Sequence, residues 1–321
     1  MSIRQELVII VPCYNEQEVL SHFYSEINRV TKQLIDLHCI FLFIDDGSQD
    51  NTLQLLKSMK KYDDRVNYIS FSRNFGKEAA IFAGLQNAKG DFIAVIDVDL
   101  QDPPELLKIM YKNIMEDGYD VVIARRATRK KEPILRSFFT KMFYRLMNKL
   151  SDVPIIDGVR DFRLMTRQVV NAVLQMSEYN RFSKGIFSWV GFKTKYISYE
   201  NVERAAGQTK WSLWQLFVYS ISGITSFSSK PLLISSWLGL VASFFSFIFI
   251  ITIIVRTIAF GDPVSGWPST IAIILFMGGI QLLSIGLLGE YMSKTYAEVK
   301  KRPIYLAKEK SFDNNIEKGK S

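Results

Sequence analysis

The stretch from Phe92 to Glu105, FIAVIDVDLQDPPE, carries oxygen-bearing side chains whose types and spacing suit a divalent cation. Its first residues, Phe92 to Ile96, form an apolar run with the length and β-branched content of a buried parallel strand. Asp97, Asp99 and Gln101 follow, and in an extended chain residues two apart point to the same side, so their oxygens would converge. Mg²⁺ is commonly held by one or two carboxylates together with substrate phosphates. The stretch therefore predicts a metal-bridged nucleotide diphosphate.

The residues after these acids read as the start of a helix. Asp102 is suited to the N-cap, Pro103 to the first helical position and Glu105 to completing a capping box. The acids would then lie at the carboxyl end of a strand, which is where ligands bind in open α/β sheets.

The same order of strand, polar turn and helix recurs along the first half of the chain. Asn15 and Glu18 predict a helix cap after the first strand, and the apolar pattern extends that helix to about Leu37. Strands alternating with helices predict an α/β domain with a mostly parallel sheet, and the polar turns would meet at one edge of it. The expected strands are Leu7–Val11, Ile40–Ile44, Val66–Phe71, Phe92–Ile96 and Val121–Ala124, and the other two polar turns begin with Asp45-Asp46 and with Arg73 to Lys77.

The C-terminal third contains two uncharged stretches, Leu232 to Val255 and Ser269 to Gly289, each about long enough to span a bilayer. Lysines and an arginine follow the second stretch, so the positive-inside rule places this tail and residues 1–230 in the cytoplasm. Residues 231–321 would then form the membrane part and a basic tail. The alternative interpretation is that the two stretches are buried core helices. Residues 133–150 and 210–227 have helical amphipathic patterns that suit either a core-facing helix or one lying in the membrane interface.

Composition narrows the class of protein only slightly. The net charge of +8 suits an anionic partner, and nucleic acid, an anionic membrane face and phosphorylated substrates all qualify. Cys13 and Cys39 show no CxxC or metal-ligand spacing, so we expect both to be reduced and structural. The N-terminal residues MSIRQELVIIVP lack the pattern of a signal peptide.

Six motifs in a fixed order give a more specific indication. With the two apolar stretches, the chain resembles the family 2 glycosyltransferases of GT-A fold. Within that family it is similar to the membrane-attached polyprenyl-phosphate glycosyltransferases, which include dolichol-phosphate mannose synthases and bactoprenol glucosyl transferases. The motifs are PCYNE (12–16), IDDGSQDNT (44–52), SRNFGKEAA (72–80), DVDLQDPPE (97–105), DFRLM (161–165) and the pair of C-terminal spans.

The resemblance implies roles for particular residues. From the residues themselves, Asp46 could simply cap the turn that follows it, and Arg73 with Lys77 could be a solvated cation pair. The residues implied to bind the nucleotide sugar are Pro12, Tyr14, Glu16, Asp45 or Asp46, Arg73, Lys77, Asp97 and Arg204. Asp97, Asp99 and Gln101 would be ligands of Mg²⁺ or Mn²⁺, Asp161 the catalytic base, and Arg163 and Lys210 contacts of the acceptor phosphate. Arg160 stands where the similar enzymes have glycine before DFRLM.

The activity that the resemblance implies is inverting transfer of one sugar, with UDP-glucose as the expected donor, to undecaprenyl or another polyprenyl phosphate. UDP-N-acetylglucosamine or another nucleotide sugar is the alternative donor. The expected setting is the bacterial inner membrane, with a homo-oligomer whose termini are cytoplasmic and with no nucleic-acid partner. A processive polysaccharide synthase would carry a QxxRW motif and more spans. A nucleotide-sensing two-span scaffold or transporter would not need the acid triplet together with Asp161.

Overall fold

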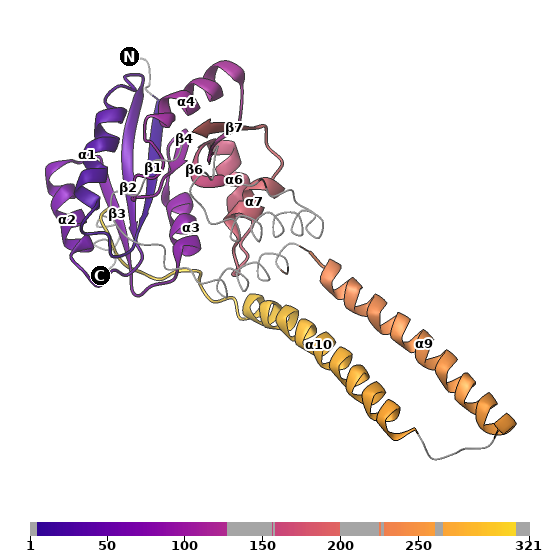
Figure 1. The fold of residues 1–321 in the computed structure, drawn as a ribbon. Helices are drawn as coiled ribbons and strands as arrows, with labels where there is room; N and C mark the ends of the chain where they lie inside the picture. Colours follow the sequence, from indigo (N-terminus) through magenta and orange to yellow (C-terminus); the bar gives the residue numbers. More distant parts are fainter. Residues whose placement is uncertain are drawn as a thin grey trace.

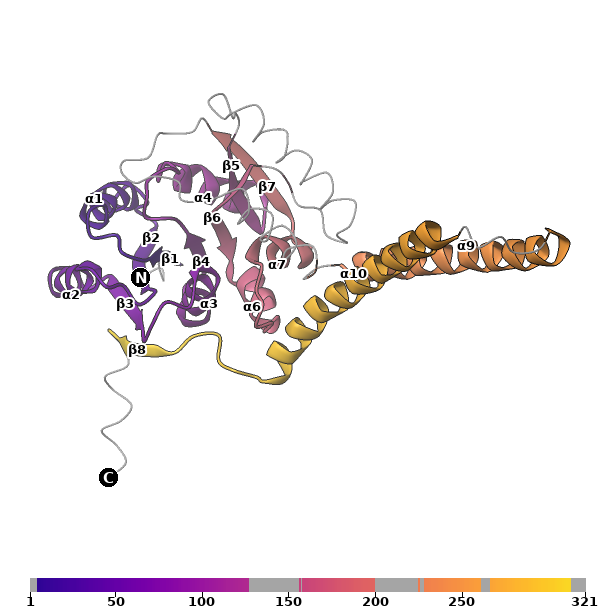
Figure 2. The same cartoon turned by 60° about the horizontal axis from the view of Figure 1, so that its bottom comes forward.

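The computed structural model describes residues 5–126, 156, 158–199, 225, 228–260 and 266–312. An α/β domain is built around one eight-stranded sheet, and two long helices project from it side by side (Figure 1 and Figure 2). The expected amphipathic helices at 133–150 and 210–227 fall almost entirely outside the described residues, as do Arg204 and Lys210.

The sheet is mixed but mostly parallel around its centre, as predicted. Strand β1 (Gln5–Cys13) lies between β2 (Leu37–Asp45) and β4 (Phe92–Val95) and is parallel to both. Residues 7–11 of β1 are at most 3% exposed, because helices cover both faces of the sheet, and this explains their unbroken apolar run. The strand order is β7-β5-β6-β4-β1-β2-β3-β8, and the remaining strands are β3 (Val66–Phe71), β5 (Val121–Arg126), β6 (Val159–Thr166), β7 (Thr194–Tyr199) and β8 (Ala307–Lys310).

Two apolar layers fix the helices on the sheet. Helices α1, α2 and α4 supply Phe23, Leu56 and Leu107 to one face, while α3, α6 and α7 supply Ala80, Val170 and Phe187 to the other. Cys13 and Cys39 are buried and free, as expected. The helices of the domain are α1 (Leu20–Thr31), α2 (Thr52–Tyr62), α3 (Lys77–Asn87), α4 (Leu106–Asp117), α6 (Arg167–Gln175) and α7 (Ser183–Trp189).

Several local predictions were wrong. Helix α1 begins at Leu20 and ends at Thr31, because Asn15 adopts a positive φ of 54° in the preceding loop and Leu37 already belongs to β2. Asp102 is not the N-cap of α4, since that helix begins at Leu106, behind a turn through Pro103 to Glu105.

Strand β6, which contains the DFRLM motif, was not predicted from the sequence. It inserts antiparallel between β4 and β5 and pairs Phe92 with Thr166 and Val95 with Arg163. Continuing that register by two residues past the end of β4 places Asp97 opposite Asp161. The topology therefore brings together two acids that lie 64 residues apart in the chain.

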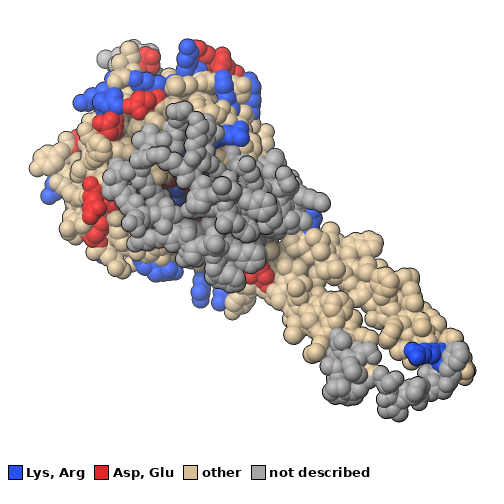
Figure 3. Space-filling model, in the orientation of Figure 1, with Lys and Arg blue, Asp and Glu red and all other residues tan. Residues whose placement is uncertain are grey.

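The two projecting helices are α9 (Lys230–Phe260) and α10 (Trp267–Val299), of 31 and 33 residues. At 1.5 Å per residue they are about 46 and 50 Å long, which exceeds the roughly 30 Å hydrocarbon core of a bilayer. By length and composition, Lys230–Ile253 and Ile273–Val299 are candidate membrane spans, and neither is buried within the molecule. Figure 3 shows a surface along this pair that is almost free of charged side chains until its far end.

The segment after α10 returns to the α/β domain rather than trailing away as a basic tail. Strand β8 pairs antiparallel with β3 at the edge of the sheet, and the Tyr305 ring stacks on Phe71 with 4.9 Å between centroids. The backbone N–H of Ser72 donates to the carbonyl of Leu306 at 2.9 Å. This strand therefore reaches the loop that begins at Ser72.

Candidate active site

Two loops at the carboxyl edge of the sheet are joined by hydrogen bonds from backbone N–H groups to side-chain oxygens. The backbone N–H groups of Asn15 and Glu16, after β1, donate to the hydroxyls of Ser48 and Thr52, after β2, at 2.9 Å each. In return, the Gln49 N–H donates to Asn15 Oδ1 at 2.8 Å. These bonds fix the segment of Tyr14 and Glu16 against the DDGS turn, as the predicted meeting of polar turns requires.

The two acids of that turn have different surroundings. Asp45 is 1% exposed and accepts hydrogen bonds from the Ser70 hydroxyl (2.7 Å) and the Ser48 N–H (3.1 Å). Asp46 accepts the N–H groups of Phe75 (2.6 Å) and Gly76 (2.9 Å), and burial raises its pKa. Asp45 therefore caps the turn, whereas Asp46 holds the following loop and also lines the cavity described below.

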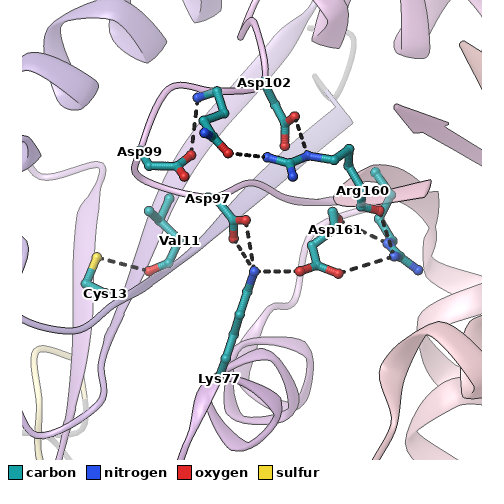
Figure 4. Close-up of polar contacts among 10 residues, drawn as sticks. Val11, Cys13, Lys77, Asp97, Asp99, Asp102, Arg160 and Asp161 are labelled. Atoms are coloured by element: carbon teal, nitrogen blue, oxygen red, sulfur yellow. Dashed lines mark hydrogen bonds and ion pairs between the residues drawn. The ribbon is translucent and has the colours of Figure 1, made fainter. Parts of the chain in front are cut away.

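Lys77 connects the two acids that β4 and β6 bring together. Its Nζ lies 2.7 Å from Asp97 Oδ1 and 2.5 Å from Asp161 Oδ2, so one ammonium bridges both carboxylates (Figure 4). Helix α3 presents this side chain because Gly76, with φ at 95°, turns the chain immediately before it. The three side chains are 44%, 22% and 20% exposed, so the cluster is open to solvent on one side.

The bridge sets the protonation states of the cluster. Burial acts to raise the pKa of Asp161, but Lys77, Lys184 and Arg163 outweigh it and hold that pKa well below its usual range. The pKa of Asp97 is raised, chiefly by burial and despite Lys77. Burial acts to lower the pKa of Lys77, yet the two carboxylates raise it. Asp161 is therefore ionised at neutral pH and Lys77 is charged.

A cavity of about 490 Å³ opens beside this cluster and collects most of the predicted nucleotide-binding residues. Arg73 is an exception, since it lines a neighbouring cavity of about 390 Å³ and places its guanidinium 4.1 Å from the centroid of the Phe75 ring. The cavity beside Lys77 is lined by Pro12, Cys13, Tyr14, Glu16, Asp46, Asn74, Gly76, Lys77, Ala80, Asp97, Val98 and Asp99.

The expected metal ligands are only partly brought together. Strand β4 ends at Val95 and the chain then turns, with Leu100 at a φ of 53°, so the prediction of an extended stretch was wrong. Asp97 and Asp99 both line the cavity, whereas Gln101 Oε1 accepts a hydrogen bond from Arg160 Nη2 at 2.9 Å. Among the described residues, no three His, Cys, Asp or Glu side chains gather as a complete ligand set. Two carboxylates facing a cavity still fit a hard cation that takes its other ligands from phosphates.

Arg163 lies behind the catalytic candidate rather than in the open cavity. It is 2% exposed, and burial lowers its pKa. Its Nε donates to the backbone oxygen of Asp161 at 3.1 Å, and its Nη2 is 3.9 Å from Asp161 Oδ1. The guanidinium also stacks on Phe187, 4.0 Å from the ring centroid. In this position Arg163 fixes the backbone at Asp161 and favours the ionised form of the Asp161 carboxylate.

Sequence reasoning missed the partners of Asp102. The carboxylate is 1% exposed and accepts hydrogen bonds from Arg160 Nε (2.9 Å) and the Tyr199 hydroxyl. These residues lie 58 and 97 positions away, and no local pattern links them. The one signal was Arg160 itself, a charged residue at a position where the resemblance implied glycine.

Comparisons with known proteins show which family the chain belongs to. A family model described as glycosyl transferase family 2 matches residues 8–174. Putative glycosyltransferase CsbB of Bacillus subtilis is 47% identical over 306 residues, covering 95% of this chain and 92% of that protein. The prophage bactoprenol glucosyl transferase homolog of Escherichia coli is 44% identical (94% and 98%), and the bactoprenol glucosyl transferase of Shigella phage SfII is 41% identical (96% and 99%).

Among solved structures, mannosyltransferase PcManGT from Pyrobaculum calidifontis, in complex with GDP-Man and Mn²⁺, matches at a TM-score of 0.45 and 13% identity, covering 94% of this chain and 89% of that one. The chain belongs to glycosyltransferase family 2: it is a glycosyltransferase with a GT-A α/β domain and two candidate C-terminal membrane helices.

Proposed function

We propose that this protein transfers a single glucose from UDP-glucose to undecaprenyl phosphate or a similar polyprenyl phosphate, with inversion at the anomeric carbon. The observation that carries the proposal is the pairing of Asp97 and Asp161 around Lys77, in a chain that continues into two apolar helices. Relatives named bactoprenol glucosyl transferase, similar over almost the whole chain, support both the sugar and the lipid.

The cavity beside Lys77 is the proposed donor site. Tyr14, Glu16 and Asp46 line one side of it, where carboxylates would accept hydrogen bonds from the uracil N3–H and the ribose hydroxyls. Asp97 and Asp99 would hold Mg²⁺ or Mn²⁺ together with the diphosphate. When bound, such a cation stabilises negative charge on the leaving diphosphate. Lys77 adds a second positive charge on the same side, and Arg73 and Arg204 are the remaining proposed donor contacts.

Asp161 is the proposed catalytic residue. An acceptor phosphate has a second pKa near 6, so much of it is already a dianion at neutral pH and needs little help from a general base. Asp161 would accept the proton of the monoanionic fraction and, together with the cations around it, share the work of orienting the attacking phosphate oxygen in line with the sugar–phosphate bond. The bond from that oxygen to the anomeric carbon forms as the bond to UDP breaks, so an α-linked donor gives a β-linked product. Arg163 would support this residue from behind, and Lys210 would contact the acceptor phosphate.

The two long apolar helices support a membrane arrangement for the protein. We propose that α9 and α10 cross the inner membrane and that the α/β domain and both termini lie on the cytoplasmic side. The basic residues after α10 favour this orientation. We propose in addition that the protein assembles as a homo-oligomer, as the resemblance implies. The cytoplasmic end of α10 lies against the α/β domain, because Glu298 Oε1 accepts the Tyr179 N–H at 2.8 Å.

The direct test is product formation by the intact protein in membranes. Purified membranes are incubated with undecaprenyl phosphate, Mg²⁺ or Mn²⁺ and a panel of radiolabelled UDP-sugars, and the lipid is then extracted and analysed. We expect labelled lipid from UDP-glucose. Label from UDP-N-acetylglucosamine alone would overturn the choice of sugar, and no labelled lipid from any donor would overturn the activity.

Two variants test the proposed residues. Asp161→Asn keeps the shape of the side chain but removes its charge, and Asp99→Ala removes a proposed metal ligand. We expect both to make almost no product while the domain stays folded by circular dichroism. Full activity in either variant would refute the role assigned to that residue.

A further inference from the structure

Asp102 is a buried carboxylate in the turn between the proposed metal ligands and helix α4. It is 1% exposed, and its Oδ1 accepts hydrogen bonds from Arg160 Nε at 2.9 Å and from the Tyr199 hydroxyl. Its Oδ2 has no hydrogen-bond partner among the described residues. Burial of a charged carboxylate is costly unless it is paired or hydrogen-bonded, and Arg160 supplies a counter-charge to Asp102.

Arg160 contacts the same turn a second time. Its Nη2 donates to Gln101 Oε1 at 2.9 Å, so one guanidinium holds two consecutive residues of the turn. Its own backbone belongs to β6, immediately before Asp161, and its carbonyl oxygen accepts a hydrogen bond from Arg163 Nη2 at 3.1 Å. Figure 4 shows the Arg160 side chain reaching from the Asp161 strand to Asp102.

This link replaces backbone pairing at the point where the chemistry takes place. The ladder between β4 and β6 ends at Val95 and Arg163, two residues before Asp97 and Asp161 would face each other. Beyond that point the two segments are joined through Lys77 at the open side of the cluster and through Arg160 at its buried side. The distance from the metal-binding carboxylates to Asp161 therefore depends on the Arg160 contacts.

We propose that Arg160 is a positioning residue for sugar transfer, which fixes the turn carrying Asp97 and Asp99 against the strand carrying Asp161. The proposal rests on the proposed function. It also assigns Gln101 a supporting role, because its amide oxygen is held by Arg160 rather than turned to the cavity. A guanidinium suits the task, since its planar fork reaches both acceptors at once, whereas a lysine ammonium is a point charge on a flexible stem.

The test separates donor binding from turnover. Arg160→Lys keeps a positive charge beside Asp102 but does not hold Gln101 in the same geometry. We expect its kcat to fall about 10²-fold, the effect of a misplacement of about 1 Å in an active site. We expect its affinity for UDP in the presence of Mn²⁺, measured by titration calorimetry, to stay within about threefold of wild type. Gln101→Ala added to Arg160→Lys should cost little more, because both changes release the same contact.

A second arginine provides the matched control. Arg29 also reaches the start of α4, where it pairs with Glu105, but it is 50% exposed and its ion pairs, with Glu26 and Glu105, do not involve β6. Arg29→Met should keep kcat within about twofold.

Three results would overturn the proposal. They are an unchanged kcat in Arg160→Lys, a loss of UDP affinity as large as the loss of kcat/KM, and wild-type activity of Arg160→Lys when it is assayed well below a lowered Tm. The last result would show that the variant is only less stable. Absence of product from the wild-type protein would instead refute the proposed function, so the two failures are distinguishable.

Discussion

Removing the ammonium that bridges Asp97 and Asp161 should damage both stability and turnover, in a way that depends on pH. Lys77→Met keeps most of the side-chain volume but leaves two carboxylates facing each other. Exposed ion pairs contribute up to about 1 kcal/mol, and breaking a fully buried pair costs about 3–5 kcal/mol. Because the Lys77 side chain is 44% exposed and the acids about one-fifth exposed, we expect a loss of about 2 kcal/mol in the free energy of unfolding. In a domain of this size that corresponds to a fall of about 4–8 °C in Tm.

The sign of the pH dependence follows from the pKa directions. In the wild-type protein the pKa of Asp161 is depressed, so its stabilising contribution is present above the unfolded pKa of about 3.9 and is lost as pH falls below that value. Without Lys77 the two carboxylates repel each other, and the folded pKa of at least one of them rises above its unfolded value. Stability of the variant is then lost as pH rises through that raised pKa. The Tm difference between wild type and Lys77→Met should therefore be larger at pH 8 than at pH 5.

Turnover should fall further than stability. In the proposed reaction Lys77 lies beside the leaving diphosphate, where negative charge develops, and loss of one such stabilising group typically costs about 10²–10³ in rate. The assay is transfer of radiolabelled glucose to undecaprenyl phosphate, with Tm measured by scanning fluorimetry from pH 5 to pH 8. Lys195→Met is the control, because Lys195 is 38% exposed and pairs with Asp117 at 3.0 Å, and neither residue lines the cavity. Transfer within threefold of wild type, or a Tm difference that shrinks toward pH 8, would refute this account of the bridge.

Two further changes test the loops around the cavity. Gly47 has a φ of +69°, and a Cβ there would lie 2.4 Å from the carbonyl carbon of Arg73, so Gly47→Ala should raise the KM for UDP-glucose. Gly118→Ala is the control, because Gly118 has a similar φ of +63° but a Cβ there would meet nothing within 4 Å. This control variant should leave the KM unchanged. A chain that stops after Arg302 keeps both apolar helices but loses strand β8 and the Leu306 carbonyl that holds Ser72. If these contacts hold the loop after Ser72 in place by about 1.4 kcal/mol, the KM for the donor should rise about tenfold in membranes. Equal effects of the two glycine substitutions, or an unchanged KM in the shortened chain, would contradict these expectations.

Features that depend on residues adjacent in the sequence were predictable. The central strands are continuous apolar runs because both faces of the sheet are covered, and Val66 to Phe71 was predicted with the bounds that β3 has. The meeting of the polar turns followed from the rule that parallel strands end at one edge. The predicted ends of helices were less accurate where hydrogen bonds between distant segments override local preference. Asp102 has the composition of a helix cap, yet it is buried against Arg160 and Tyr199, which no window around Asp102 contains.

The pairing of strands distant in sequence was not predictable in the same way. DFRLM was recognisable as a motif, but only the antiparallel insertion of β6 beside β4 explains why its aspartate faces Asp97. Lys77, Lys184 and Arg163 lower the pKa of Asp161, and the first two lie far from it in the sequence.

The return of the chain to the sheet after α10 connects the candidate membrane helices directly to the edge of the proposed donor site. Strand β8 extends the edge at β3, and the Ser72 N–H bonds Leu306 immediately before the loop of Arg73 and Gly76. That loop is held on its other side by Asp46, through the N–H groups of Phe75 and Gly76. The loop is therefore fixed between the core of the domain and a segment whose other end is a candidate membrane span. If that loop binds the donor as proposed, strand β8 is the covalent and hydrogen-bonded route from α10 to it.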